Sequence, residues 1–479
     1  MAKRIVLAVA VVLLVLAGVL AANTARLKPA PLADAAPAVT IDPAAVERLA
    51  GAVRIATVSG EVPPPAESLA AFQDLLRQSF PLVHAALRQE TIGGGSLLYT
   101  WQGKDPGAPA LLLAAHQDVV PVEAGAWQQP PFGGAIAGGF VWGRGTLDDK
   151  GSLMAILEAV ERLLGQGYQP RQTVYLAFGH NEEIGGEGGA QAIAALLRQR
   201  HARIGLAVDE GSAVLDGVIP GVGAPVAMIG VAEKGYVSVE IAARGPGGHS
   251  SLPSADNAAV RVARAVARIE DDPMPARIDG AIGGLLDGIA PYTRGAMRVA
   301  LANRWLSGPL VKRQLLANPT TAAALRTTTA LTILEAGTKD NVLPQRARAV
   351  INHRILPGET IAGVVAHDRA AVDDPRVTVR ALPGGFEPGP PVATGSAEYR
   401  RFAAVVGATF PNAAVAPGLV VGATDLRHYQ AMAGAAFRFE PIVVTPADLE
   451  RIHGKDERIG VDAYMRAIGF YERLIRGGP

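Results

Sequence analysis

Short apolar runs alternate with helical patterns through the first half of this 479-residue chain. The run at 110–115 has the length of a buried strand, and 150–164 places Met154 and Leu157 at helical spacing. Repeated alternation of strand and helix predicts an α/β fold with a mostly parallel, doubly wound sheet. The alternation resumes after residue 399, so we expect this unit to be split in the sequence.

The middle of the chain follows a different order of elements. Its predicted strands and helices give the order βαββαβ, which indicates a smaller α+β domain of the ferredoxin-like type. A stretch at about 271–327 interrupts this order and shows no clear period. We therefore expect the larger domain at 44–231 and 384–479, with the smaller domain inserted at 232–383.

The N-terminus has the pattern of an export segment. Lys3 and Arg4 precede an uninterrupted apolar run at 5–22. This pattern predicts a signal peptide or membrane anchor at 1–23, followed by an Ala/Pro-rich linker at 24–43. We expect an exported protein that is either anchored in a membrane by this helix or secreted or periplasmic after cleavage.

Composition excludes several kinds of site and partner. The chain has 0 cysteines, so disulfides, thiol nucleophiles and cysteine-ligated zinc are ruled out. A metal site would have to use histidine and carboxylate ligands. The 45 basic and 44 acidic residues nearly cancel, and this balance gives no electrostatic reason to expect a nucleic acid partner.

Acidic and histidine residues cluster beside four of the predicted elements. In an open parallel sheet, ligands bind beyond the carboxyl ends of the strands, so these side chains should meet at one edge. Crowded carboxylates raise each other's pKa, and one or two divalent cations relieve that repulsion. Each pair of such residues, taken alone, is more often part of a turn or of a helix start. Together the four pairs favour a metal site. The pairs are His116 and Asp118, Asp148 and Asp149, Glu182 and Glu183, and Asp209 and Glu210.

Several motifs resemble one enzyme family. They are HQDVVP at 116–121 with Trp127 and PPF at 130–132, GRGTLDDKG at 143–151, and GHNEE at 179–183. The resemblance is to the dinuclear zinc metallopeptidases that include carboxypeptidase S, Gly-Xaa carboxypeptidase, aminoacylase and succinyl-diaminopimelate desuccinylase. The turn at 146–150 and TDLRHY at 424–429 look most like the carboxypeptidase S-like subgroup. The similarity runs from about residue 43 to the C-terminus.

The resemblance implies a co-catalytic site with two Zn²⁺, for which Co²⁺ or Mn²⁺ could substitute. His116, Asp148 and Asp209 would hold one ion. Asp148 would bridge to the second ion, which Glu183 and His453 would also hold. The inserted domain matches the family's lid and dimerisation domain.

Three further residues receive catalytic roles from the same resemblance. Glu182 would be the general base, with its side chain opposite that of Glu183 if the segment is extended. Asp118 would fix the ring of His116. His249, in a Gly-rich segment of the lid, would donate a hydrogen bond to the developing oxyanion, either within one chain or across a dimer.

Substrate recognition is assigned to four residues. Asn341 and Arg354 match lid positions that bind a substrate carboxylate, although Arg354 could equally be a surface charge on a strand. Arg427 and His428 would be further contacts. We therefore expect a hydrolase that cleaves N-acyl amino acids or short peptides beside a free carboxylate. The alternatives are a dipeptidase, an amino-acid deacetylase or desuccinylase, and a non-catalytic binding protein.

Overall fold

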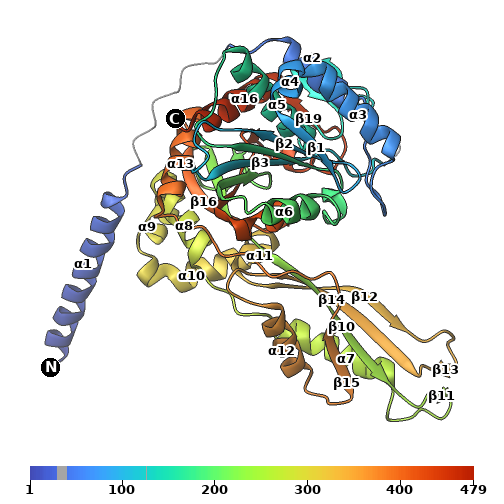
Figure 1. Cartoon of the computed structure of the whole chain (residues 1–479). Coiled ribbons are helices and arrows are strands. Elements are labelled where there is room, and N and C mark those ends of the chain that lie inside the picture. Colours follow the sequence, from blue (N-terminus) through green and yellow to red (C-terminus); the bar gives the residue numbers. More distant parts are fainter. Residues whose placement is uncertain (30–39, 124, 126, 479) are drawn as a thin grey trace.

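The computed structural model describes residues 1–29, 40–123, 125 and 127–478. A rounded larger unit carries an elongated smaller unit that projects from one side (Figure 1). The helix α1 (Ala2–Arg26) extends away from the larger unit. Most of the predicted linker, at 30–39, lies outside the described residues.

The larger unit is built on a ten-stranded sheet in the order β1-β2-β6-β3-β7-β17-β9-β8-β18, with β16 paired to β9. In its centre, β3 is parallel to β6 and β7, and β17 is parallel to β7. The prediction of a mostly parallel sheet is confirmed. The strands are β1 (Arg88–Ile92), β2 (Ser96–Trp101), β3 (Ala110–His116), β6 (Val174–Gly179), β7 (Ile204–Asp209), β8 (Val214–Leu215), β9 (Val226–Glu233), β16 (Ala414–Val420), β17 (Ala433–Arg438) and β18 (Val443–Val444).

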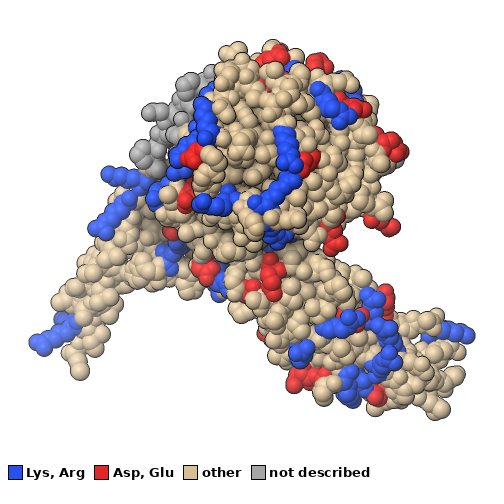
Figure 2. Space-filling model, in the orientation of Figure 1, with Lys and Arg blue, Asp and Glu red and all other residues tan. Residues whose placement is uncertain are grey.

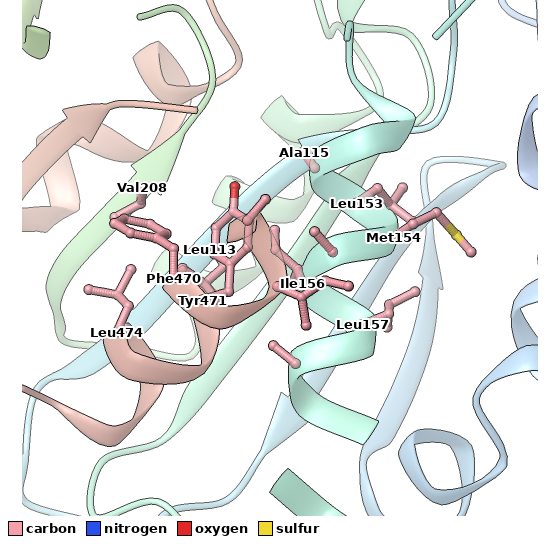
Figure 3. Packing of buried hydrophobic residues seen from close by; sticks show 14 of the residues in the cluster. Leu113, Ala115, Leu153, Met154, Ile156, Leu157, Val208, Phe470, Tyr471 and Leu474 are labelled. Atoms are coloured by element: carbon pink, nitrogen blue, oxygen red, sulfur yellow. The ribbon is translucent and has the colours of Figure 1, made fainter. Parts of the chain in front are cut away.

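Helices cover both faces of this sheet. Leu111 and Leu113 of β3 pack in one core with α5 and α16, while Leu112 packs with α6 on the opposite face. Figure 3 shows the first of these cores, where α5 and α16 meet β3. The helices are α2 (Ala44–Val53), α3 (Ala66–Ser79), α4 (Pro81–Ala86), α5 (Lys150–Gly165), α6 (Ala190–Gln199), α13 (Ala397–Thr409), α14 (Leu426–Tyr429), α15 (Pro446–Leu449) and α16 (Val461–Arg476).

The smaller unit, which we call the lid, has the predicted βαββαβ order. Its four strands form an antiparallel sheet in the order β12-β14-β10-β15. Two short strands, β11 (Gly248–His249) and β13 (Val342–Leu343), pair at the lid tip farthest from the larger unit (Figure 1). The other lid elements are β10 (Gly235–Arg244), α7 (Ala258–Asp271), β12 (Thr328–Ala336), β14 (Arg346–Ile355), α12 (Ile361–Val372) and β15 (Val377–Ala381).

The stretch without a clear period folds into four helices that pack on the larger unit. The helix α8 lies against β16 at close range, because Cβ atoms at Gly284 and Gly288 would come within 2.7 Å of Pro417 and Ala416. Small residues therefore make this contact. The helices are α8 (Gly280–Ile289), α9 (Gly295–Ala302), α10 (Arg304–Leu316) and α11 (Pro319–Leu325).

Two chain crossings connect the lid to the larger unit. At the first, β9 ends at Glu233 and β10 begins at Gly235. The second crossing lies beside it, since the backbone amide of Tyr236 donates to the carbonyl of Phe386 at 3.0 Å and the amide of Phe386 donates back at 2.9 Å. A separate three-stranded sheet in the order β19-β5-β4 completes the fold: β4 (Ala135–Ala137), β5 (Phe140–Trp142) and β19 (Arg458–Gly460).

Candidate metal centre and active site

Neighbouring parallel strands deliver polar side chains to one edge of the large sheet. The strand β3 ends at His116, and β7 ends at Asp209. Between them in sequence, β6 is followed by the short 3-10 helix η1 (Glu182–Ile184). Because parallel strands end on the same side, these segments come together as the sequence predicts.

The first cluster of side chains forms around His116. Its Nε2 atom lies 2.8 Å from Asp148 Oδ1 and 3.5 Å from Glu210 Oε1. Its Nδ1 atom donates to the backbone carbonyl of Asp118 at 2.9 Å, which orients the ring with Nε2 toward the cluster. We call His116, Asp148 and Glu210 the first group; one potential ligand atom from each lies within 4.8 Å of the others.

The second cluster uses the other oxygen of Asp148. His453 Nε2 lies 2.9 Å from Asp148 Oδ2 and 3.4 Å from Glu183 Oε2. These three residues, the second group, also meet within 4.8 Å. Asp148 thus presents one oxygen to each group, which is the arrangement of a carboxylate that bridges two ions. His453 comes from a segment far along the chain from Asp148 and Glu183.

The donor set fits two divalent cations. A tetrahedral ion with ligands at about 2.0–2.1 Å has its ligand atoms about 3.3 Å apart, close to the spacings in both groups. Imidazole nitrogens and carboxylate oxygens are ligands that zinc accepts. Glu183 Oε1 is buried without a hydrogen-bond partner, as expected of a carboxylate oriented for a cation.

Glu210, and not Asp209, belongs to the first group. Asp209 is the last residue of β7 and pairs in register with Arg438 of β17. Side chains alternate along an extended chain, so the next residue points to the other side. The side chain of Glu210 approaches His116, whereas Asp209 Oδ2 is buried and has no hydrogen-bond partner. Glu210 thus lies in the first group in this structure, while the role of Asp209 as a ligand stays a prediction.

Glu182 lies next to the second group without being part of it. The segment is a 3-10 turn and not the extended chain expected from the sequence, yet Glu183 joins His453 and Glu182 does not. The backbone amide of Glu182 donates to Asp118 Oδ1 at 3.1 Å, and that of Glu183 donates to Asp118 Oδ2 at 3.2 Å. Asp118 therefore positions both glutamates as well as lying beside His116.

Burial and neighbouring groups shift the pKa values of these carboxyl groups in different directions. Burial raises the pKa of Glu182 well above its usual range, and the charge of Asp425 adds to the rise. Burial also raises the pKa of Glu210. Burial alone would raise the pKa of Asp148, but hydrogen bonds from His116 and His453 outweigh it and lower that pKa.

A buried glutamate that the sequence analysis missed holds the loop before Asp148. Glu457 Oε1 accepts hydrogen bonds from the amides of Gly145 and Leu147 at 2.9 and 2.8 Å. Its other oxygen pairs with Arg144 at 2.6 Å. Glu457 lies only four positions after His453, so one segment supplies a member of the second group and supports the loop carrying Asp148.

Two of the predicted site residues lie at the lid tip. His249 is exposed in β11, where its Nδ1 atom accepts hydrogen bonds from Ser251. Asn341 precedes β13, and its backbone carbonyl accepts from the amide of Ser250 at 3.1 Å. Figure 1 places β11 and β13 at the end of the lid away from the large sheet, so this conformation does not bring these residues to the two groups.

Arg354 and Arg427 belong to a stack at the lid crossings. The guanidinium of Arg354 lies 5.0 Å from the ring centre of Tyr236, and Tyr236 stacks on Phe386 at 6.0 Å. Arg427 covers Phe386 at 5.0 Å. We call these four residues the hinge stack. Arg427 also donates to the backbone carbonyls of Gly185 and Thr424, so part of its donor capacity serves structure.

His428 lies beside the loop that follows η1. A Cβ atom at Gly186 would be 3.1 Å from His428 Nε2. Burial lowers the pKa of His428 to about 4, so this ring is neutral near pH 7, and its Nε2 atom has no hydrogen-bond partner. Its proposed contact with substrate stays a prediction.

Sequence comparison identifies relatives along most of the chain. The profile described as peptidase family M20/M25/M40 matches residues 112–477. The chain is 39% identical over 410 residues to "Probable carboxypeptidase S-like 2" of Dictyostelium discoideum, covering 85% of this chain and 78% of that protein. It is 38% identical over 436 residues to "N-fatty-acyl-amino acid synthase/hydrolase PM20D1" of Xenopus tropicalis, covering 90% and 85%.

Structural comparison gives the same fold. An M20 family metallo-carboxypeptidase from Sulfolobus solfataricus superposes with a TM-score of 0.65 at 19% identity, covering 91% of this chain and 99% of that one. A Bacillus subtilis protein described as a dinuclear metal-binding peptidase of the M20 family superposes with a TM-score of 0.55 at 15% identity, covering 91% and 98%. The resemblance read from the motifs is confirmed: this chain belongs to peptidase family M20/M25/M40.

Proposed function

We propose that this protein hydrolyses the amide bond of N-acyl amino acids or short peptides beside a free carboxylate. The observation that carries the proposal is the shared carboxylate of Asp148, with one oxygen 2.8 Å from His116 and the other 2.9 Å from His453. We propose two zinc ions, one held by His116, Asp148 and Glu210 and the other by Asp148, Glu183 and His453.

The bound ions, Glu182 and Asp118 would each have a separate role in the hydrolysis. When bound, the two ions would polarise the substrate carbonyl and lower the pKa of water. Glu182 would take the proton of the attacking water and deliver it to the leaving amine. Its raised pKa suits a group that must both accept and release a proton, and Asp118 would hold its backbone in place.

The substrate class is proposed from the relatives and from the lid. One relative is named for N-fatty-acyl-amino acids and another for carboxypeptidase S, so both names concern a bond beside an amino-acid carboxylate. Arg354 would supply the fork that binds this carboxylate. Arg427 and His428 would shape the pocket beyond it.

Completion of the site would require His249, which lies at the lid tip. His249 would reach the reacting carbonyl either through lid movement or from the partner in a homodimer. The lid offers a surface for pairing, since β12 is an edge strand and exposes Leu331, Ile333 and Leu334. Pairing of this kind would also bring Asn341 toward a substrate.

The N-terminal helix would tether the enzyme to a membrane outside the cytoplasm. Within the described residues, α1 is the one helix long and apolar enough to cross a bilayer, with a mean hydropathy of 3.2. We propose that it is retained as an anchor, because its last turns make hydrogen bonds to the folded body, including one from Asn23 to Asn303 at 3.0 Å.

A direct test combines substrate screening with metal analysis. Wild-type protein and Glu182→Gln would be incubated with a panel of N-acyl amino acids and dipeptides, and the same peptides with amidated C-termini. We expect the wild type to release free amine only from substrates with a free carboxylate. Glu182→Gln should retain two metal equivalents and lose about 10²–10⁴-fold in kcat, the usual contribution of a general base.

Each alternative has its own outcome in this experiment. Binding of the panel without amine release would indicate a non-catalytic protein. Release from dipeptides alone would indicate a dipeptidase, and release from acetyl or succinyl amino acids alone would indicate a deacetylase or desuccinylase. Near-wild-type turnover by Glu182→Gln would remove Glu182 from the role of base.

A further inference from the structure

The helix α1 is attached to the α9–α10 helices at a defined level. Asn303, which is 1% exposed, lies between α9 and α10 and donates hydrogen bonds to the carbonyl of Leu20 at 3.3 Å and to the hydroxyl of Thr24 at 3.4 Å. Arg298 of α9 also donates to the carbonyl of Leu27. The attachment therefore involves the last turns of α1, including part of the apolar run at 5–22.

The same pair of helices exposes large apolar side chains. Trp305, Leu306 and Leu310 of α10 are 62%, 48% and 65% exposed. Trp305 and Pro309 are four residues apart, as are Leu306 and Leu310, so these side chains share one face of the helix. Arg313 lies one turn further on this face and is also exposed. Exposed apolar patches of this kind mark contact sites.

The position along α1 at which α9 and α10 are attached determines where a bilayer would contact the exposed face of α10. A 25-residue helix is about 37 Å long, and the hydrocarbon core of a bilayer is about 30 Å thick. If residues 5–22 occupy that core, the hydrogen bonds at Leu20 and Thr24 hold α9 and α10 at its boundary. Figure 1 shows α9 and α10 beside the C-terminal end of α1, and the N-terminal part of α1 extends away from them.

The chemistry of the exposed face suits the boundary between headgroups and acyl chains. Tryptophan is enriched at that depth because its ring is apolar and its N–H is polar. Basic side chains beside apolar ones are typical of helices that lie in the plane of a membrane surface. Figure 2 shows α1 itself as uncharged along its length, with blue residues toward its ends.

We propose that α9 and α10 form a membrane-contact surface in which Trp305, Leu306 and Leu310 insert among the lipids of the bilayer that α1 crosses. The proposal rests on α1 being retained in a membrane, and it is independent of the hydrolytic activity. This surface gives the insertion at 271–327 a function: it holds the larger unit at the membrane at a fixed orientation, where α1 alone would leave it free to swing.

Quenching of tryptophan fluorescence by lipid tests this surface. The full chain would be reconstituted in vesicles of phosphatidylcholine and phosphatidylglycerol, with or without bromine on acyl carbons near the headgroup. Subtracting the emission of Trp305→Phe from that of the wild type isolates Trp305 among the 4 tryptophans. We expect this difference emission to lose most of its intensity in brominated vesicles and to resist aqueous iodide.

A matched control places a tryptophan on an exposed apolar site elsewhere. Val62 is 67% exposed and precedes α3 in the larger unit, so Val62→Trp in the Trp305→Phe background should be quenched by iodide and not by brominated lipid. Trp305 behaving like this control would overturn the proposal. Protection of Trp305 from both quenchers would also overturn it, since another protein surface would then cover the face. If the enzyme is active but does not float with vesicles, the membrane-contact surface is excluded and the proposed hydrolysis still stands.

Discussion

Asp118 organises the active site through three atoms. Its two carboxylate oxygens accept from the amides of Glu182 and Glu183 and from the hydroxyl of Ser59, and its carbonyl accepts from the ring of His116. The bonds to His116, Glu182 and Glu183 position residues that would touch a cation or the attacking water. Outer-shell groups of this kind commonly matter almost as much as the ligands themselves.

Substitution of Asp118 by asparagine keeps the shape and replaces one accepting oxygen by a donor. An amide NH₂ facing a backbone amide cannot form the bond, so the turn at Glu182 should shift. We expect Asp118→Asn to reduce metal affinity or kcat by about 10–100-fold, as for other outer-shell changes. Ser59→Ala removes only the 2.6 Å hydroxyl bond and is the control, with an expected loss of about tenfold or less. Equal effects of the two substitutions on kinetics and metal titration would contradict this role.

The choice between Asp209 and Glu210 is tested by a matched pair of substitutions. Glu210→Gln removes a negative oxygen from the first group, so we expect one of two metal equivalents to be lost or to bind at least about 10-fold more weakly. Asp209→Asn should retain both equivalents, because Asp209 lies outside both groups. Metal analysis after dialysis against a weak chelator provides the measurement. Loss of metal from Asp209→Asn alone would restore the original assignment.

At the scale of residues, the sequence indicates which segments bring candidate ligands to the edge of the sheet. His116 comes directly at the end of an apolar run, and its position could be predicted from that run. Asp209 and Glu210 are adjacent, and a single position decides which one faces the site. That choice depends on where β7 stops being extended, and sequence patterns locate strand ends poorly.

The elements that meet at the lid crossings are coupled by the hinge stack. Arg354 and Tyr236 belong to lid strands, Phe386 to the returning chain, and Arg427 to α14 of the larger unit. Each cation–aromatic contact contributes about 0.5–2 kcal/mol, depending on solvent exposure. Arg427 in turn donates to the carbonyl of Gly185, just after η1. The stack therefore connects the proposed carboxylate-binding arginine to the turn that carries Glu182.

Removal of the central ring should uncouple these elements. We expect Phe386→Leu to raise KM about 5–10-fold for substrates with a free carboxylate, corresponding to loss of contacts worth about 1 kcal/mol. Amidated substrates should be affected far less, because they do not use Arg354. Phe410→Leu removes a ring under Arg466 at 5.6 Å, away from the lid, and serves as the matched control. A similar rise in KM for both substrate types would show that the stack acts only on stability.

At the scale of elements, strands and long helices could be predicted because large apolar residues line their buried faces. The strand predicted at 110–115 and the helix predicted at 150–164 end within a residue of β3 and α5. The helices of the insertion escaped prediction although α8 buries Ile282, Leu286 and Ile289 at helical spacing, because its many glycines are unfavourable in a helix. The exposed face of α10 likewise breaks the usual pattern, since its large apolar side chains point away from the body.

For the whole molecule, bound metal should contribute to stability. The two groups hold carboxylates from separate parts of the larger unit close together, and cations would offset their repulsion. Because ions bind the folded site and not the unfolded chain, we expect EDTA to lower Tm and abolish activity. Addition of excess Zn²⁺ should restore both, and EDTA preloaded with zinc is the control. Unchanged Tm and activity, with less than one metal equivalent remaining, would contradict a metal-dependent site.

The distance in sequence between the two groups governs when the enzyme can become active during its synthesis. The first group is complete once Glu210 has been made, whereas the second waits for His453 near the end of the 479 residues. Glu457, which supports the loop of Asp148, arrives later still. A ribosome-bound chain therefore carries an unfinished site for more than half of its translation. The site in this way stays incomplete until the last segment has emerged and folded back.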